Sequence, residues 1–332
     1  MKDTLLEVRG LRVSIGGDEG EARILDFIDL DLNRGEILGL VGESGCGKST
    51  VLKAILGLLP QGARVLEGEI RFKGESLTRL PPAEIARRIR GRAMGFVPQD
   101  PFQSFNPVFT VGRQMLEILR WSGLPGEPTG AGWGRAVRAR ARKRLIDLLR
   151  AVQISDPERV LERYPHQFSG GQRQRILIAG ALAAQPEVIL ADEPTTALDV
   201  TTQMQILRLM RRLAREFDVS VLFVSHDFGA VAQLCDRVAV VYAGQTVEIG
   251  QAAEVIAAPE HPYTRALIAC HPDREGSLEG IPGQVGSMLA PPSGCRFHPR
   301  CEEAVAICGE ARPAVVRTRT GRCVACVHAR AS

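Results

Sequence analysis

A glycine-rich loop between an apolar run and a helical pattern is the feature that most constrains the fold of this 332-residue chain. Residues 36–41 are predicted to form a buried strand, and the loop that follows is Gly42-Glu43-Ser44-Gly45-Cys46-Gly47-Lys48-Ser49. This sequence fits G-x-x-x-x-G-K-[ST], in which backbone N–H groups at a helix N-terminus surround phosphate oxygens. We expect Lys48 to reach the β and γ phosphates of a nucleotide and Ser49 to ligate Mg²⁺. The alternative is a glycine-rich turn that carries a lysine by chance.

Two other predicted strands end in polar side chains. The apolar run 188–191 is followed by Asp192 and Glu193, and the apolar run 221–224 leads to His226. In open α/β sheets, ligands bind beyond the carboxyl ends of the strands. We therefore expect Asp192 to hold Mg²⁺ through water, Glu193 to orient or deprotonate the attacking water, and His226 to contact the γ-phosphate. Solvated strand ends are the alternative interpretation.

The remaining pattern is that of an α/β domain with a helical interruption. Continuous apolar runs are typical of parallel strands that are buried on both faces. Strands are predicted at residues 5–13, 23–32, 65–74, 188–191, 221–224 and 238–242, with a turn at 16–20. Helical patterns cover residues 48–59 and 202–217, and also 101–167 apart from a Gly/Pro-rich patch at 123–134.

Composition excludes several classes of function. The net charge of +4 is too small to indicate a nucleic-acid partner, and the basic run at residues 135–150 is predicted to be the solvated face of a helix. The sequence has no apolar run of 18 residues, and its N-terminus lacks the pattern of a signal peptide. We expect the chain to stay in the cytoplasm and to reach a membrane only by docking onto other chains.

A second glycine motif gives the chain a family resemblance. Ser169-Gly170-Gly171-Gln172 resembles the signature motif of the ABC transporter ATPase family. Gln99 matches the family's Q-loop glutamine, and Asp199, in Ala197-Leu198-Asp199, matches its D-loop. The resemblance covers about residues 5–255, and five motifs occur in the family's order.

This resemblance implies an α/β fold with the parallel-sheet core of P-loop NTPases, an N-terminal antiparallel β subdomain, an inserted helical subdomain at about 101–168 and a small Cys-rich C-terminal appendage. The ATPase domain would span 1–258 and the appendage 259–332. Glu193, His226 and Gln99 would be catalytic, and Ser49, Gln99 and Asp192 would hold Mg²⁺. The signature motif would contact ATP that is held by an opposite subunit. The residues that bind ATP would be Gly42, Glu43, Ser44, Gly45, Cys46, Gly47, Lys48, Ser49 and Thr50.

One position departs from the family pattern. The family usually stacks adenine on an aromatic side chain in the N-terminal strand region, and this chain has Ile15 there. Apolar contact with the base remains possible, whereas aromatic stacking does not.

A narrower resemblance is to the importer subfamily for dipeptides, oligopeptides and nickel. It rests on residues 99–112 and 164–167, and on three tail segments at 261–267, 281–283 and 295–301. The subfamily implies a peripheral protein at the cytoplasmic face of the cell membrane. Its partners would be two transmembrane permease subunits, a second ABC ATPase that we expect to be a homologue, and an extracytoplasmic solute-binding protein. Peptide is the expected cargo, with nickel or another small solute as the alternative.

Five of the eight cysteines lie in the tail. Their spacing, C-x5-C-x6-C and then C-x2-C, is not that of a standard zinc finger. We expect Cys295, Cys301, Cys308 and Cys326 to hold a [4Fe–4S] cluster or zinc, with His298 and His328 in reserve and Cys323 as an extra thiol. Free thiols that pack as small apolar groups are the alternative.

Other functions fit the sequence less well. ABC ATPases that act on nucleic acid or ribosomes without transport typically carry two ATPase domains or a long coiled coil, and this chain has one such domain and no heptad run. The tail disfavours an exporter ATPase. A small-molecule kinase with a P-loop has no need of the signature motif.

Overall fold

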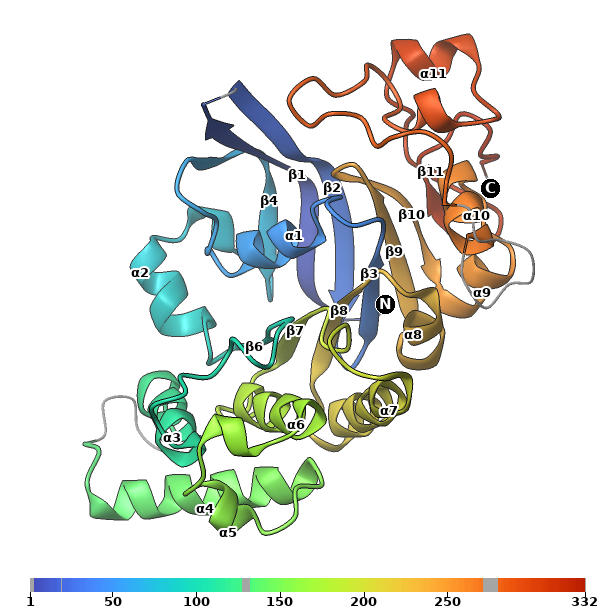
Figure 1. Cartoon of the computed structure of the whole chain (residues 1–332). Helices are drawn as coiled ribbons and strands as arrows, with labels where there is room; N and C mark the ends of the chain where they lie inside the picture. The colour runs from blue at the N-terminus through green and yellow to red at the C-terminus, as the bar shows by residue number, and fades with distance from the viewer. Residues whose placement is uncertain (1–2, 19, 127–131, 271–279, 332) are drawn as a thin grey trace. The chain divides into compact units, whose positions relative to one another are not determined.

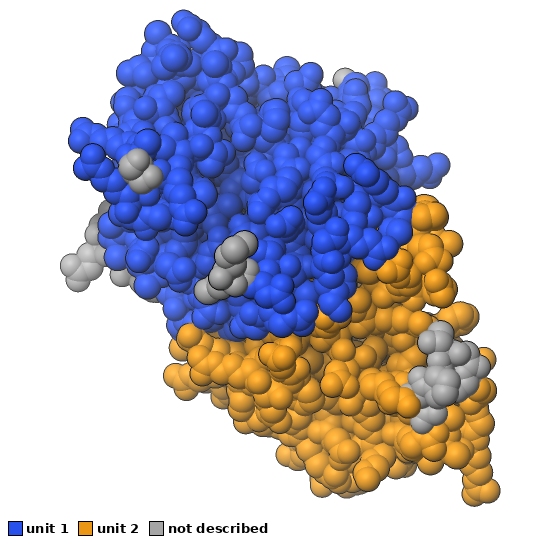
Figure 2. Space-filling model, turned by 180° about the vertical axis from the view of Figure 1, so that it is seen from behind, with its two compact units in different colours: residues 1–80, 224–332 blue, residues 81–223 orange. Residues whose placement is uncertain are grey.

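The computed structural model describes residues 3–18, 20–126, 132–270 and 280–331, and the chain forms two compact units (Figure 2). The first unit contains residues 1–80 and 224–332, and the second contains residues 81–223. Residue 19 of the predicted turn, residues 127–131 of the predicted Gly/Pro-rich patch and the first two residues of the N-terminus lie outside the described residues.

The first unit begins with an antiparallel sheet, as the sequence predicted (Figure 1). Its strands lie in the order β2-β1-β4-β5, and Val8 of β1 is opposite both Leu30 and Ile70. Alternate residues of β1 are apolar and buried, which is the pattern of a strand with one face against a core. The strands are β1 (Thr4–Gly17), β2 (Gly20–Asn33), β4 (Ala63–Phe72) and β5 (Glu75–Ser76).

The glycine-rich loop follows a strand of the second sheet, which has eight strands in the order β11-β12-β10-β9-β3-β8-β7-β6. β3 (Ile37–Val41) pairs in parallel with β9 (Arg237–Tyr242), and all five residues of β3 are buried. β10 (Gln245–Gln251) adds to β9 in the antiparallel direction. Because β3 is enclosed, the loop that follows it starts from a fixed point.

Helix α1 (Lys48–Ile55) follows the loop and is shorter than the expected helix, which extended to about Leu59. Leu56 caps the helix, and Gly57 then takes a φ of 61°, a left-handed conformation that ends helices. Pro60 lies three residues beyond Gly57. The predicted start of the helix is confirmed, whereas its predicted end is wrong by one turn.

The second unit combines two parallel strands with most of the long helices. β6 (Met94–Val97) pairs in parallel with β7 (Val188–Asp192), and β8 (Ser220–Ser225) returns the chain to the first unit. Among the described residues, no helix is both long and apolar enough to cross a membrane. The other elements are η1 (Leu77–Arg79) of the first unit, and α2 (Pro82–Glu84), η2 (Ile85–Ile89), α3 (Val111–Ser122), α4 (Arg135–Ala151), α5 (Pro157–Val160), η3 (Pro165–Gln167), α6 (Gly170–Ala181) and α7 (Val200–Glu216) of the second.

Helix α4 confirms the prediction for the basic run. Arg138, Arg140 and Lys143 are exposed, whereas Leu145 and Leu149 are buried. The charges therefore lie on the solvated side of an amphipathic helix.

The tail belongs to the first unit and extends its sheet. β12 (Cys323–Val324) pairs with β10, placing Val324 opposite Glu248, and β11 (Val316–Arg317) pairs with β12. Arg296 is 2% exposed and contacts the carboxylate of Asp26 on β2 at 3.1 Å. The other elements of the first unit are α8 (Phe228–Leu234) and α9 (Ala252–Ala257), which precede the tail, and α10 (Pro262–Ala269), η4 (His298–Arg300) and α11 (Ala306–Glu310), which belong to it.

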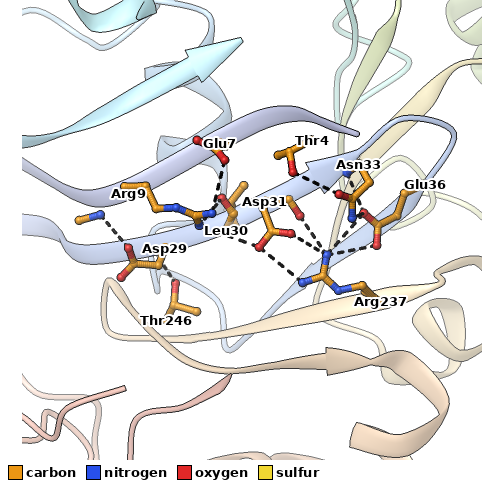
Figure 3. A network of polar contacts seen from close by, with 11 residues as sticks. Thr4, Glu7, Arg9, Asp29, Leu30, Asp31, Asn33, Glu36, Arg237 and Thr246 are labelled. Carbon is orange, nitrogen blue, oxygen red and sulfur yellow. Dashed lines mark hydrogen bonds and ion pairs between the residues drawn. The ribbon is translucent and has the colours of Figure 1, made fainter. Parts of the chain in front are cut away.

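A polar network joins β9 to the end of β2 (Figure 3). Arg237 Nη1 donates to Asp31 Oδ2 at 2.9 Å and to Glu36 Oε1 at 3.3 Å. Glu36 is 4% exposed, and its other oxygen accepts from the backbone and side chain of Asn33. The guanidinium thus compensates a carboxylate that the fold removes from water.

We expect Arg237→Met to lower the free energy of unfolding by about 3 kcal/mol, because it leaves Glu36 buried without its cation. Arg9→Met is the matched control, since Arg9 is 50% exposed and its ion pairs are 3.7 and 3.9 Å long. The control should change stability by less than about 1 kcal/mol. Urea denaturation of both variants measures the difference, and equal effects would contradict the role of burial.

Helix α10 begins at a buried histidine. His261 is 1% exposed, and its Nδ1 accepts from the backbone N–H of Tyr263 at 3.0 Å. Burial, together with a smaller effect of the nearby positive charge of Arg265, lowers the pKa of His261 from 6.5 to about 3. The imidazole is therefore neutral in the folded protein at physiological pH.

Between pH 6.5 and pH 3 the unfolded chain binds a proton at this histidine and the folded chain does not. The free energy of unfolding therefore decreases as the pH falls below 6.5, and this histidine contributes about 1.4 kcal/mol per pH unit to the decrease. His261→Asn retains a cap acceptor but does not titrate. Unfolding measured from pH 7 to pH 5 should show a shallower slope for this variant, and an unchanged slope would contradict the assignment.

Candidate functional site

The glycine-rich loop at residues 42–49, called the phosphate loop below, leads directly from β3 into α1. Gly47 caps the helix with a φ of 101°. A Cβ atom at this position would lie 2.7 Å from the side chain of Leu25 and 3.0 Å from the carbonyl oxygen of Ile24. Both the backbone conformation and the close packing against β2 therefore require glycine here.

Lys48 is buried at the start of α1. Its Nζ donates to the carbonyl oxygens of Gly42 at 2.8 Å and Glu43 at 3.0 Å, so the ammonium is held across the loop. Ser49 and Thr50 follow in the first helical turn and are half-buried. The loop thus combines a fixed positive charge with the N-terminus of a helix, an arrangement that attracts anions.

Glu43 makes contacts that the sequence did not predict. Its carboxylate forms an ion pair with Arg300, and its backbone N–H donates to the Tyr263 hydroxyl at 2.9 Å. Both partners lie in the tail segments 261–267 and 295–301, for which the sequence indicated a subfamily resemblance but no contact with the loop.

In the second unit, two separately predicted residues come together. Glu193 follows β7, and its Oε2 accepts from Gln99 Nε2 at 3.3 Å. The same oxygen accepts from Thr196 Oγ1 at 3.0 Å. Glu193 has a φ of 42°, a left-handed conformation that is uncommon outside glycine and is frequent at functional sites. Asp192 is the last residue of β7 and is buried.

Sequence reasoning missed Thr196. Its hydroxyl lies three residues after Glu193, which is the spacing of a turn, and that spacing is the signal that could have indicated the contact.

The signature motif begins helix α6. Ser169 caps the helix by accepting from Gln172 N at 3.3 Å, and Gln172 Oε1 accepts from Ser169 N at 3.1 Å. This reciprocal pair is a capping box. Ser169 and Gln172 are exposed, and Gly170 and Gly171 are half-exposed, so the motif lies on the surface of its unit.

Asp199 caps the next helix, α7. It accepts from Thr202 N at 2.9 Å and from Thr202 Oγ1 at 2.7 Å, and these hydrogen bonds lower the pKa of Asp199. The predicted D-loop acid is therefore ionised at neutral pH.

The predicted residues are divided between the two units. Those of the phosphate loop and the exposed His226, which follows β8, belong to the first unit. Gln99, Asp192, Glu193, Asp199 and the signature motif belong to the second. Ile15, where the family has an aromatic residue, is half-buried on β1 between Ala22 and Ala63.

The predicted metal centre of the tail is not supported. Among the described residues, no group of three or more His, Cys, Asp or Glu side chains is arranged to hold a metal ion. The pKa values of the Cys295, Cys301 and Cys326 thiols are raised, mainly by burial. A raised pKa favours the protonated thiol, whereas a metal binds the thiolate. The proposed reserve ligands contact carbonyl oxygens instead, His298 that of Cys295 and His328 that of Glu303.

Two protein families match the sequence. The family described as ABC transporter matches residues 25–196, and the family described as oligopeptide/dipeptide transporter, C-terminal region, matches residues 247–308. The first match contains the phosphate loop, Gln99, the signature motif and Glu193, and the second contains the beginning of the tail.

Individual relatives are similar over nearly their whole length. A probable peptide ABC transporter ATP-binding protein of Sinorhizobium fredii is 45% identical, over 98% of this chain and 95% of its own. The dipeptide transport ATP-binding protein DppD of Bacillus subtilis is 43% identical, over 94% of this chain and 90% of its own. The oligopeptide transport ATP-binding protein OppD of Salmonella typhimurium is 40% identical over the same shares.

A solved structure shares the fold. It is the dimeric, post-hydrolysis state of the ATP-binding cassette MJ0796 bound to ADP and Pi, with a TM-score of 0.63 and 29% identity. The alignment covers 75% of this chain and 99% of that one.

Proposed function

Because the chain belongs to the ABC transporter family, we propose that it is the ATP-hydrolysing motor subunit of a membrane importer for dipeptides or oligopeptides. The observation that carries the choice of cargo is the tail, whose residues 247–308 match the oligopeptide/dipeptide transporter C-terminal region. The names of the relatives from Bacillus subtilis and Salmonella typhimurium agree with this choice.

The phosphate loop would bind the triphosphate. Its backbone N–H groups, the ammonium of Lys48 and the N-terminus of α1 supply positive potential where the phosphates would lie. Ser49, Gln99 and Asp192 offer the oxygen ligands that Mg²⁺ prefers. When bound, Mg²⁺ would neutralise charge on the phosphates.

Glu193 would act as the general base on the attacking water. Gln99 and Thr196 both donate to Oε2 of its carboxylate, and these hydrogen bonds would hold the carboxylate in place for proton transfer from a water molecule. His226 would hydrogen-bond the γ-phosphate.

The signature motif would need a partner subunit. The motif is an exposed helix N-terminus with two glycines and a serine. Such an N-terminus can contact an anion that is held by another subunit. We infer that it contacts ATP held by a second ABC ATPase, and the dimeric cassette among the similar structures supports this arrangement. Asp199 would lie at the same interface.

The remaining partners follow from the importer assignment. They would be two permease subunits and an extracytoplasmic solute-binding protein, with this chain at the cytoplasmic face of the membrane. Release of the γ-phosphate would loosen the ATPase pair, and this movement would be passed to the permeases.

We expect Glu193→Gln to reduce ATP hydrolysis by about 100-fold or more while ATP still binds, because only proton transfer is removed. Glu216→Gln, an exposed acid at the end of α7, serves as the control and should hydrolyse ATP normally. Phosphate release and nucleotide binding are measured on the assembled complex. Normal turnover by Glu193→Gln would refute its assignment as the base.

The cargo is tested by uptake in cells that carry Lys48→Ala. Uptake of labelled dipeptide, a longer peptide and nickel is compared with that of wild-type cells, and we expect loss of peptide uptake because phosphate binding depends on Lys48. Loss of nickel uptake alone would replace peptide by nickel as the cargo. Retention of all three activities would overturn the proposed role of this ATP site in import.

A further inference from the structure

Two segments of the tail contact Glu43 of the phosphate loop, and another segment holds one of the two contacting side chains. Tyr263 lies in the first segment, Ile281 and Pro282 in the second, and Arg300 in the third. These are the segments that carried the subfamily resemblance, and neither phosphate binding nor hydrolysis accounts for them. All of them belong to the same compact unit as the loop.

The contact between Arg300 and Glu43 has the strongest geometry that a guanidinium and a carboxylate can adopt. Arg300 Nη1 lies 2.9 Å from Glu43 Oε2, and Nη2 lies 3.1 Å from Oε1, so the pair is bidentate. The side chain of Arg300 is only 4% exposed and that of Glu43 is 25% exposed. Solvent therefore screens this ion pair less than one on an open surface.

The remaining N–H groups of Arg300 are also occupied. Nε donates to Pro282 O at 3.0 Å, Nη2 to Ile281 O at 2.9 Å and Nη1 to the Tyr242 hydroxyl at 3.3 Å. A guanidinium has five N–H donors, and five contacts are formed. Burial by itself would lower the pKa of Arg300, but the hydrogen bonds to Glu43 and Tyr242 more than offset it, and the pKa is raised. The side chain is thus a permanent, fixed cation.

The backbone around Arg300 is shaped to admit it. Gly283 has a φ of 80°, and a Cβ atom there would lie 3.2 Å from Arg300 Cγ. Glycine at this position allows both the left-handed turn and the close passage of the arginine stem. This explains the glycine of the Ile281-Pro282-Gly283 segment.

A second contact holds the backbone of the same loop residue. The Glu43 N–H donates to Tyr263 Oη at 2.9 Å, and Tyr263 is fully buried. Its ring packs against Tyr242 and Phe297, with centroid distances of 4.5 and 5.3 Å. An aromatic cluster built from the tail and β9 therefore fixes the hydroxyl that receives the loop N–H.

Charge explains why the loop needs these contacts. Glu43 places a carboxylate on the loop that would receive a triphosphate, and a carboxylate and a phosphate repel each other. Arg300 neutralises that carboxylate and holds it on the side of the tail. Without Arg300, the carboxylate would be an uncompensated charge beside the phosphates.

We propose that Arg300 is a positioning residue for the phosphate loop, so that the C-terminal appendage helps to set the affinity of the ATP site. This inference rests on the proposed function, because it assumes that the loop binds ATP. Arg300 touches no reacting atom, and its effect passes through Glu43.

The test compares ATP binding to full-length variants, measured with a fluorescent ATP analogue in the absence of Mg²⁺. We expect Arg300→Gln to bind about tenfold more weakly, the size usual for losing a hydrogen bond to a charged group. Arg265→Gln is the matched control, because Arg265 forms an ion pair with Glu303 in the same tail but does not contact the loop. The control should bind ATP as the wild type does.

A double variant separates positioning from simple support of the fold. If the unpaired carboxylate repels the triphosphate, Glu43→Gln combined with Arg300→Gln should bind ATP more tightly than Arg300→Gln, by about threefold or more. A merely structural role of Arg300 predicts no such recovery. Hydrolysis in the assembled complex should show a raised KM for ATP with little change in kcat.

Further variants keep the proposal testable if Arg300→Gln does not fold. Arg300→Lys retains the charge without the bidentate geometry, and its affinity for ATP should lie between those of the wild type and Arg300→Gln. Tyr263→Phe retains the aromatic packing but removes the acceptor of the Glu43 N–H, and it should weaken ATP binding about threefold.

The outcomes distinguish the two proposals. Provided that Lys48→Ala binds no ATP, either of two results would overturn this inference alone. The first is wild-type ATP affinity in a folded Arg300→Gln variant. The second is wild-type ATP affinity in both Tyr263→Phe and Arg300→Lys. Absence of recovery in the double variant would also overturn it. A wild-type chain that does not bind ATP would instead overturn the proposed function.

Discussion

The turn from β3 into α1 is the constraint on which the rest of the site depends. β3 is buried along its whole length, and α1 begins at a glycine that closely contacts β2. The phosphate loop between them therefore has fixed ends, and its N–H groups and the Lys48 ammonium take their places without further adjustment. A site for phosphate needs such preorganised donors, because donors that must be ordered on binding cost conformational entropy.

The surroundings of this turn are held by buried charges as well as by apolar packing. Arg237 compensates Glu36, which directly precedes β3, and Arg300 compensates Glu43, which lies in the loop after β3. Each pair joins segments that are more than 200 residues apart in the sequence. Such pairs add specificity to the arrangement, since the carboxylate would be costly to bury in any fold that did not bring its arginine near.

The second unit shows how a few local hydrogen bonds organise the residues proposed for hydrolysis. Gln99 and Thr196 both donate to one oxygen of Glu193, which stands in a left-handed conformation just after a buried strand. Ser169 and Asp199 each cap the helix that follows them. Polar side chains at strand and helix ends thus serve the local structure and remain exposed to a ligand.

Much of the fold was predictable, because the signals are local. Alternating apolar residues identified β1 and β2, continuous apolar runs identified β3, β7, β8 and β9, and the polar residues that follow these runs gave the candidate site. The end of α1 was not predicted, since the left-handed turn at Gly57 overrides the helical pattern. The expected metal centre failed for a different reason. Cysteine spacing along a chain does not fix how thiols are oriented in space, and no metal-holding group forms among the described residues.

The sequence by itself determined the phosphate loop, the strand-end carboxylates, the signature motif and the family, because each depends on residues that are adjacent in the chain. Only the tertiary structure decided the partners of those residues. That Glu43 meets Arg300 and Tyr263, and that Gln99 meets Glu193, depends on how distant segments pack. Contacts over such separations are set by the burial of whole strands and rings, and no local pattern encodes the pairing of one side chain with another.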